Sequence, residues 1–275
     1  MRKNFKLRRR LWGFFLLFVA SIGVWGVCSF WKMTLRPGAV YIGSLLAFLI
    51  LFLTLFNARK KIPFIPLFKV STWTQLHIYV GYFSLIVFLF HLDFSWPNGL
   101  VEQLLAITFT AVTLSGVLGL FLSRWLPRRL THSGESLVFE RIPCYRRQVR
   151  EEAEELVLQA EKESASSSLS DLYVDHLDCY FRSRPGVLTA VLPLPLPYRQ
   201  ILGKVISVQR YLNTGEKESM EKLSSLIEAK RNMDYQDSAQ RLLKLWLFVH
   251  IPLTYCLLLL SAVHIYFALY YGGWS

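Results

Sequence analysis

Five long apolar stretches constrain this chain more than any other feature of its sequence. They run from Leu11 to Trp31, Ala39 to Phe56, Trp73 to Leu92, Val101 to Ser123 and Leu245 to Tyr271. A helix needs about 17–25 apolar residues to cross the hydrocarbon core of a bilayer, which is about 30 Å thick. Each stretch reaches that length and is bounded by charged residues, proline or glycine. The sequence therefore predicts five transmembrane helices.

The composition excludes several other classes of protein. Of 275 residues, 53% are hydrophobic and 18% are charged, whereas soluble domains carry about 25% charged residues. Disorder, collagen-like repeats and a small disulfide scaffold are thereby excluded. The four cysteines form no C-x-x-C pair, so neither a zinc site nor an iron–sulfur site is expected.

The lysines and arginines predict the orientation of the helices, because cationic loops resist translocation across the membrane. With the N-terminus in the cytoplasm, the two short inner segments, 1–10 and 57–72, carry ten Lys and Arg residues. The outer segments carry two, Lys32 and Arg36. We therefore expect a multi-pass protein of the inner (cytoplasmic) membrane with a cytoplasmic N-terminus and an outer C-terminus. The net charge of +12 is largely explained by this topology, so nucleic-acid binding is not expected.

The expected fold is an all-α, polytopic membrane helix bundle with a small, mainly helical cytoplasmic insertion. Residues 1–123 would hold transmembrane helices 1–4, residues 124–244 the insertion, and residues 245–275 the fifth helix and a short outer C-terminus. Within the insertion, charged residues at helical spacing predict a helix from Arg146 to Glu163 and another that begins near Glu216.

Two other segments of the insertion are predicted to lack regular structure. Residues 164–171, SASSSLSD, resemble a flexible link whose Ser170 or Asp171 caps a following helix. Residues 187–199 contain three alternating prolines, and we expect an extended segment there.

Four of the six histidines lie within the predicted spans. His77 and His91 are on the third span, and His250 and His264 are on the fifth. Both pairs are separated by fourteen residues, which in a helix returns to within about 40° of the starting direction and climbs about 21 Å. Each helix therefore presents two imidazoles on one face, one near each side of the membrane.

These histidines predict two haem sites. Because one helix intervenes, the third and fifth spans run in the same direction, so His77 faces His250 and His91 faces His264 at matched depth. Two facing imidazoles can supply both axial ligands of a haem iron. A single intramembrane histidine is more often a packing residue, but four with this common interval favour ligands, since polar residues in a bilayer are costly. A proton or metal-ion pathway remains an alternative, although the span interiors contain no Asp or Glu.

The segments HIYVGYFSLIVFLFH and HIPLTYCLLLLSAVH resemble the histidine helices of membrane di-haem b-type cytochromes. Their placement on the third and fifth helices is most similar to the ferric-reductase arrangement. This resemblance implies transmembrane electron transfer through two stacked b-type haems, with His77, His91, His250 and His264 as ligands. The chain departs from these relatives in lacking a G-x-G-x-x-G fingerprint and the PEWY quinol-site motif.

Three further residues are candidates for cofactor binding. Gly81, one turn after His77, and Gly116 in the fourth span would leave room for a macrocycle or for a close helix. Arg124 would neutralise a haem propionate at the cytoplasmic side, although an anchor in the positive-inside pattern explains it equally simply.

We expect the cytochrome b subunit of a larger redox complex, in which catalysis itself involves no residue of this chain. Its partners would be the lipid membrane and other redox subunits, such as a cytochrome c, an iron–sulfur or a dehydrogenase subunit. A quinone is a further candidate cofactor or partner. A membrane anchor without a cofactor and a metal or proton transporter are the alternatives.

Overall fold

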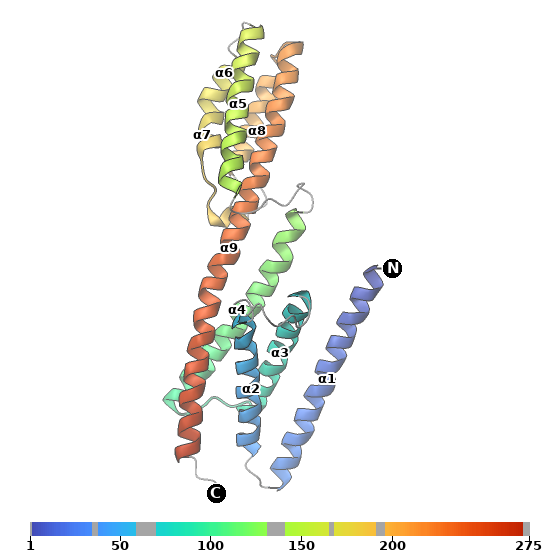
Figure 1. Cartoon of the computed structure of the whole chain (residues 1–275), viewed down its shortest axis with the longest axis vertical. Coiled ribbons are helices and arrows are strands. Elements are labelled where there is room, and N and C mark those ends of the chain that lie inside the picture. Colours follow the sequence, from blue (N-terminus) through green and yellow to red (C-terminus); the bar gives the residue numbers. More distant parts are fainter. Residues whose placement is uncertain are drawn as a thin grey trace. The chain divides into compact units, whose positions relative to one another are not determined.

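The computed structural model describes residues 2–34, 38–58, 70–130, 141–164, 168–190 and 196–271. Throughout these ranges the chain is helical or irregular, and no strand occurs in them. The helices of the first half are α1 (Arg2–Thr34), α2 (Gly38–Ala58), α3 (Val70–His91) and α4 (Leu100–Leu130). Those of the second half are α5 (Ile142–Ser164), α6 (Ser168–Leu172), η3 (Tyr173–Leu177), α7 (Asp178–Arg182), η4 (Val187–Ala190), α8 (Leu196–Gln209) and α9 (Thr214–Tyr271). The predicted all-α class is confirmed (Figure 1).

Five of the described helices are long and apolar enough to cross a membrane. Their spanning segments are Leu11–Trp31, Gly38–Leu55, Ser71–His91 and Leu100–Leu126, and the fifth lies within the long helix Gly215–Tyr271. The fifth predicted span is thus the end of α9, which also contains the charged helix expected near Glu216. The protein is a multi-pass membrane protein, as the five apolar stretches predict.

The chain divides into two compact units. The first comprises residues 1–117 and 249–275, and the second comprises residues 118–248. Two helices, α4 and α9, contribute residues to both units.

The first unit is built from α1, α2, α3, most of α4 and the end of α9. In this unit α2 packs against α3, and α1 lies alongside α3 (Figure 1). The apolar core formed there consists of Cys28, Ile42, Leu46, Leu49, Ile50, Val87, Phe88, Ala106, Phe109 and Leu257. The rings of Phe88 and Phe109 stack with centroids 4.1 Å apart and join α3 to α4.

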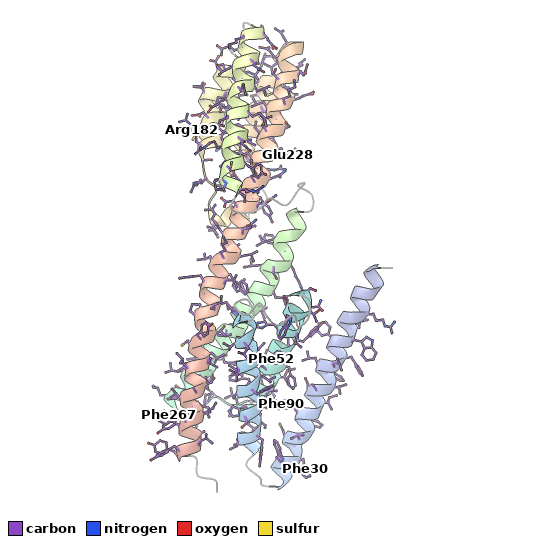
Figure 2. The ribbon with its side chains drawn as sticks, in the orientation of Figure 1. Phe30, Phe52, Phe90, Arg182, Glu228 and Phe267 are labelled. Atoms are coloured by element: carbon purple, nitrogen blue, oxygen red, sulfur yellow. The ribbon has the colours of Figure 1, made fainter. Side chains whose placement is uncertain are left out.

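The outward faces of the same helices are apolar as well. Phe30 is 62% exposed and Phe267 is 41% exposed, and both project from their helices (Figure 2). Such exposure would be costly in water. Apolar outward faces of this kind are what helices long and apolar enough to span a membrane require.

The second unit has a separate core of the soluble type. It consists of Ala153, Val157, Leu169, Leu172, Tyr173, Leu177, Tyr180, Phe181, Tyr198, Ile201, Val205, Leu212, Met220, Leu223 and Ile227. At the start of helix α9 the Glu216 carboxylate accepts a hydrogen bond from the backbone N–H of Asn213 at 2.9 Å. This is one of the two hydrogen bonds of a capping box.

A buried ionic network crosses the second unit. Lys230 is fully buried, forms an ion pair with Asp234 and lies 4.5 Å from the centre of the Tyr180 ring. Arg146 on α5 joins the network through Asp234 at 3.2 Å and Asp237 at 3.0 Å. Burial lowers the pKa of Lys230 and raises that of Asp234, although their attraction acts in the opposite direction. The network therefore links α5 to α9 at a considerable desolvation cost.

The structure differs from two sequence-based expectations in this unit. Ser170 and Asp171 lie inside α6, which begins at Ser168, so the expectation of a cap at these two residues is wrong; residues 165–167 lie outside the described residues. The proline-rich segment is also not extended throughout: Val187–Ala190 is a 3-10 helix, and α8 begins at Leu196 with Pro197 in its first turn. Proline is tolerated there because the first N–H groups of a helix have no intrahelical acceptor. Pro193 and Pro195 lie outside the described residues.

A single glycine controls a close packing contact in the second unit. A Cβ added at Gly119 on α4 would lie 1.9 Å from Trp246 on α9. We expect Gly119→Ala to lower the free energy of unfolding by about 1–3 kcal/mol, since the indole must move. Gly203→Ala on α8 is the control, because no atom lies within 4 Å of its added Cβ. It should raise stability by about 0.5–1 kcal/mol. Thermal unfolding of the detergent-solubilised protein measures both, and equal effects would contradict the packing.

The buried network yields a second prediction. Asp234→Asn leaves Lys230 and Arg146 without that carboxylate, and we expect a loss of about 3 kcal/mol in the free energy of unfolding. Glu228→Gln removes an exposed pair with Arg231 and should cost less than about 1 kcal/mol. Hydrogen exchange along residues 220–240 measures both variants, and unchanged protection in Asp234→Asn would show that the network adds no stability.

Candidate functional site

Helices α3 and α9 bring the four intramembrane histidines together in two pairs. His77 and His91 are on α3, and His250 and His264 are on α9. All four belong to the first unit. Each helix is continuous between its two histidines, so both carry an imidazole at each of two levels about 21 Å apart along the axis.

The first level joins His91 to His264. Their ring centroids are 6.3 Å apart, and the two ring planes are nearly perpendicular at 81°. Imidazoles that bind one metal ion from opposite sides have centroids about 6 Å apart, because each metal–nitrogen bond is about 2 Å and each nitrogen lies about 1 Å from its ring centre. The spacing of this pair therefore fits two axial ligands of one iron.

The second level joins His77 to His250. The two imidazoles are near enough for a charge on one ring to act on the other, and both are partly buried. Their pairing as ligands of one iron stays a prediction.

A serine on α4 contacts the second level. Nδ1 of His250 lies 3.2 Å from Oγ of Ser115, which is within hydrogen-bonding distance. Thr254 also donates a hydrogen bond to the backbone carbonyl of His250 at 2.8 Å. With Nδ1 held by Ser115, the other ring nitrogen, Nε2, is the one left for a metal. Sequence reasoning missed Ser115, because a serine on a membrane helix carries no signal of which neighbouring helix it faces.

A glycine on α2 leaves space for the ring of His91. A Cβ at Gly43 would lie 2.9 Å from Cε1 of the His91 ring. Nδ1 of His91 is buried, and no hydrogen bond is made to it among the described residues. The ring has a hydrogen bond with the backbone of Ala39, also on α2, so the chain provides a partner for only part of this imidazole. Sequence reasoning missed Gly43 as well, since a glycine in an apolar span does not reveal what packs on it.

The region between the two levels is mostly apolar. Ser84 on α3 and Ser261 on α9 are also buried there, and each donates to a carbonyl of its own helix. Val87 on α3 and Leu257 on α9 lie between the histidines of their helices and are almost completely buried. The stacked rings of Phe88 and Phe109 lie in the same core. Water is therefore largely excluded from the interval between the two histidine pairs.

The remaining predicted residues differ in their surroundings. Gly81 has open space beside it, with no atom within 4 Å of an added Cβ. Gly116 lies against the second level, where an added Cβ would be 3.7 Å from Cε1 of His250. Arg124 is exposed and belongs to the other unit, so its role at a haem propionate stays a prediction.

The donor set fits haem better than a small metal ion. In the described ranges no group of three or more His, Cys, Asp and Glu side chains could hold a metal ion. Structural and catalytic zinc sites use three or four protein ligands, whereas a haem iron needs only two from the protein. Two histidines at each level, in apolar surroundings, meet that requirement.

Comparison with known proteins gives no family for this chain, so the interpretation of the site rests on its geometry. No family model, curated protein or solved structure matches the chain.

The close approach of the His91 ring to Gly43 gives a prediction for the first level. Gly43→Val should displace the His91 ring and reduce haem bound at that level, because branched carbons cannot fit where one Cβ would already lie 2.9 Å away. Gly26→Val on α1 is the control, since no atom lies within 4 Å of its added Cβ. Haem content per chain, measured by the pyridine haemochrome spectrum, should fall from about two to about one only in Gly43→Val. A full haem content in that variant would show that haem binding does not need the space beside Gly43.

Proposed function

We propose that this protein carries electrons across the membrane through two b-type haems, each held by two histidines. The observation that supports the proposal most directly is the separation of 6.3 Å between the His91 and His264 rings. A second pair of histidines on the same two helices, His77 on α3 and His250 on α9, supports a second haem. A haem iron, when bound, supplies a one-electron ferric–ferrous couple.

The roles of this chain's residues follow from their positions. His91 and His264 would hold one haem, and His77 and His250 would hold the other. Gly43 leaves space for the ring of His91, and Ser115 orients the ring of His250. The apolar core that contains Val87, Phe88 and Leu257 excludes water and gives the low-dielectric surroundings that influence a haem potential.

The physical cost of the histidines also favours a cofactor. Polar side chains within a bilayer are expensive and are seldom retained without a function. Here four of them lie in two helices whose neighbouring core residues are apolar. Iron ligation would offset this cost by giving each pair of imidazoles a shared partner.

We further propose that the protein acts as the cytochrome b subunit of a larger redox complex, with quinone or other redox subunits as the electron donor and acceptor. The inner (cytoplasmic) membrane with a cytoplasmic N-terminus is the location favoured by the lysine and arginine distribution. The second unit, which has its own soluble-type core, would then lie in the cytoplasm and offer a surface for another subunit.

Single replacements of the histidines test the proposal. We expect His91→Ala or His264→Ala to remove one haem and His77→Ala or His250→Ala to remove the other, because each iron loses an axial ligand. His176→Ala, an exposed residue of the second unit, is the control and should keep both haems. The measurements are haem stoichiometry and the reduced-minus-oxidised spectrum of each purified variant.

Two results would contradict the proposal. Wild-type protein produced with sufficient haem but lacking a Soret band would indicate an anchor without a cofactor. Loss of haem that does not follow the two histidine pairs would contradict the ligand assignment.

A further inference from the structure

We infer that Ser115 is a positioning residue that lowers the reduction potential of the haem site held by His77 and His250. The inference rests on the proposed function and adds to it a residue that sets the potential of one site. It starts from the contact of 3.2 Å between Ser115 Oγ and His250 Nδ1.

The environment of Ser115 indicates which atom donates in this contact. Hydroxyl groups elsewhere on α4 donate to their own helix: Thr110 to Ala106 O, Thr113 to Phe109 O and Ser123 to Leu120 O. This is the usual behaviour of serine and threonine in membrane helices. If Nε2 of His250 binds iron, the proton of the neutral ring is on Nδ1, and Nδ1–H then donates to Ser115 Oγ.

This hydrogen bond has an electronic consequence for the site. An imidazole that donates its Nδ1–H becomes more basic at Nε2. A more basic axial ligand stabilises ferric over ferrous iron, and the reduction potential falls. The bond also fixes the ring orientation, because His250 can rotate only by breaking it.

At the other level, no hydroxyl contact to His91 or His264 is found among the described residues. The ring of His91 lies against Gly43 and has a hydrogen bond with the backbone of Ala39 on α2. The contact of a side-chain hydroxyl with a ligand nitrogen is thus a feature of the His77–His250 site.

The test is an equilibrium redox titration of full-length protein that carries His264→Ala, so that the His77–His250 haem alone is observed. We expect Ser115→Ala to raise its potential, with about a tenfold change in the ratio of reduced to oxidised haem, or about 59 mV for a one-electron couple. Ser115→Thr keeps the hydroxyl and should titrate like the parent. Ser84→Ala is the matched control, because Ser84 is buried on α3 and donates its hydrogen bond to the backbone carbonyl of Gly81 on the same helix.

The outcomes separate this inference from the proposed function. A potential that stays unchanged or falls in Ser115→Ala, with haem retained, overturns the inference and leaves electron transfer intact. If Ser115→Ala binds no haem, Ser115→Thr must retain it at the parental potential, and loss from the threonine variant also overturns the inference. Absence of haem from the wild-type protein overturns the proposed function instead.

Discussion

The cost of placing imidazoles in an apolar bundle is the constraint on which the rest of the site depends. A polar ring inside a bilayer must find a partner or a ligand, and α3 and α9 meet this need by bringing their histidines together at two levels. Neighbouring helices then adapt to the rings. Helix α2 contributes a glycine where His91 needs space, and α4 contributes a serine where His250 needs a hydrogen-bond partner.

Helix α9 serves two different environments along its 58 residues. Its first part supplies Met220, Leu223 and Ile227 to a soluble-type core, together with the buried Lys230. Its last part supplies two histidines to the membrane unit. Because no helix break separates these parts, the sequence places the charged segment and the histidine segment on one element. Pro252 does not end the helix, which agrees with the tolerance of proline in membrane helices.

The helices that depend on long, regular patterns were predictable from the sequence. The five spans and the charged helix before the fifth follow from runs of one residue class, which local hydropathy and charge reveal. The errors occur where short-range rules compete with packing. Ser170 and Asp171 have the chemistry of a helix cap, but α6 begins earlier, at Ser168, and contains both. Pro197 lies in the first turn of α8, where a proline is compatible with the helix.

The sequence by itself determined the number of spans, the two histidine helices and the common interval between their histidines, because these properties depend only on hydropathy and on helical geometry. The tertiary structure alone decided which neighbours the rings meet. Gly43 and Ser115 contact histidines that are distant in the chain, and nothing in their own local sequence distinguishes them from other small residues in the spans. Gly119 likewise packs against Trp246, whereas Gly81 has open space beside it. These differences arise from side chains of separate helices meeting in space, which only the packed bundle determines.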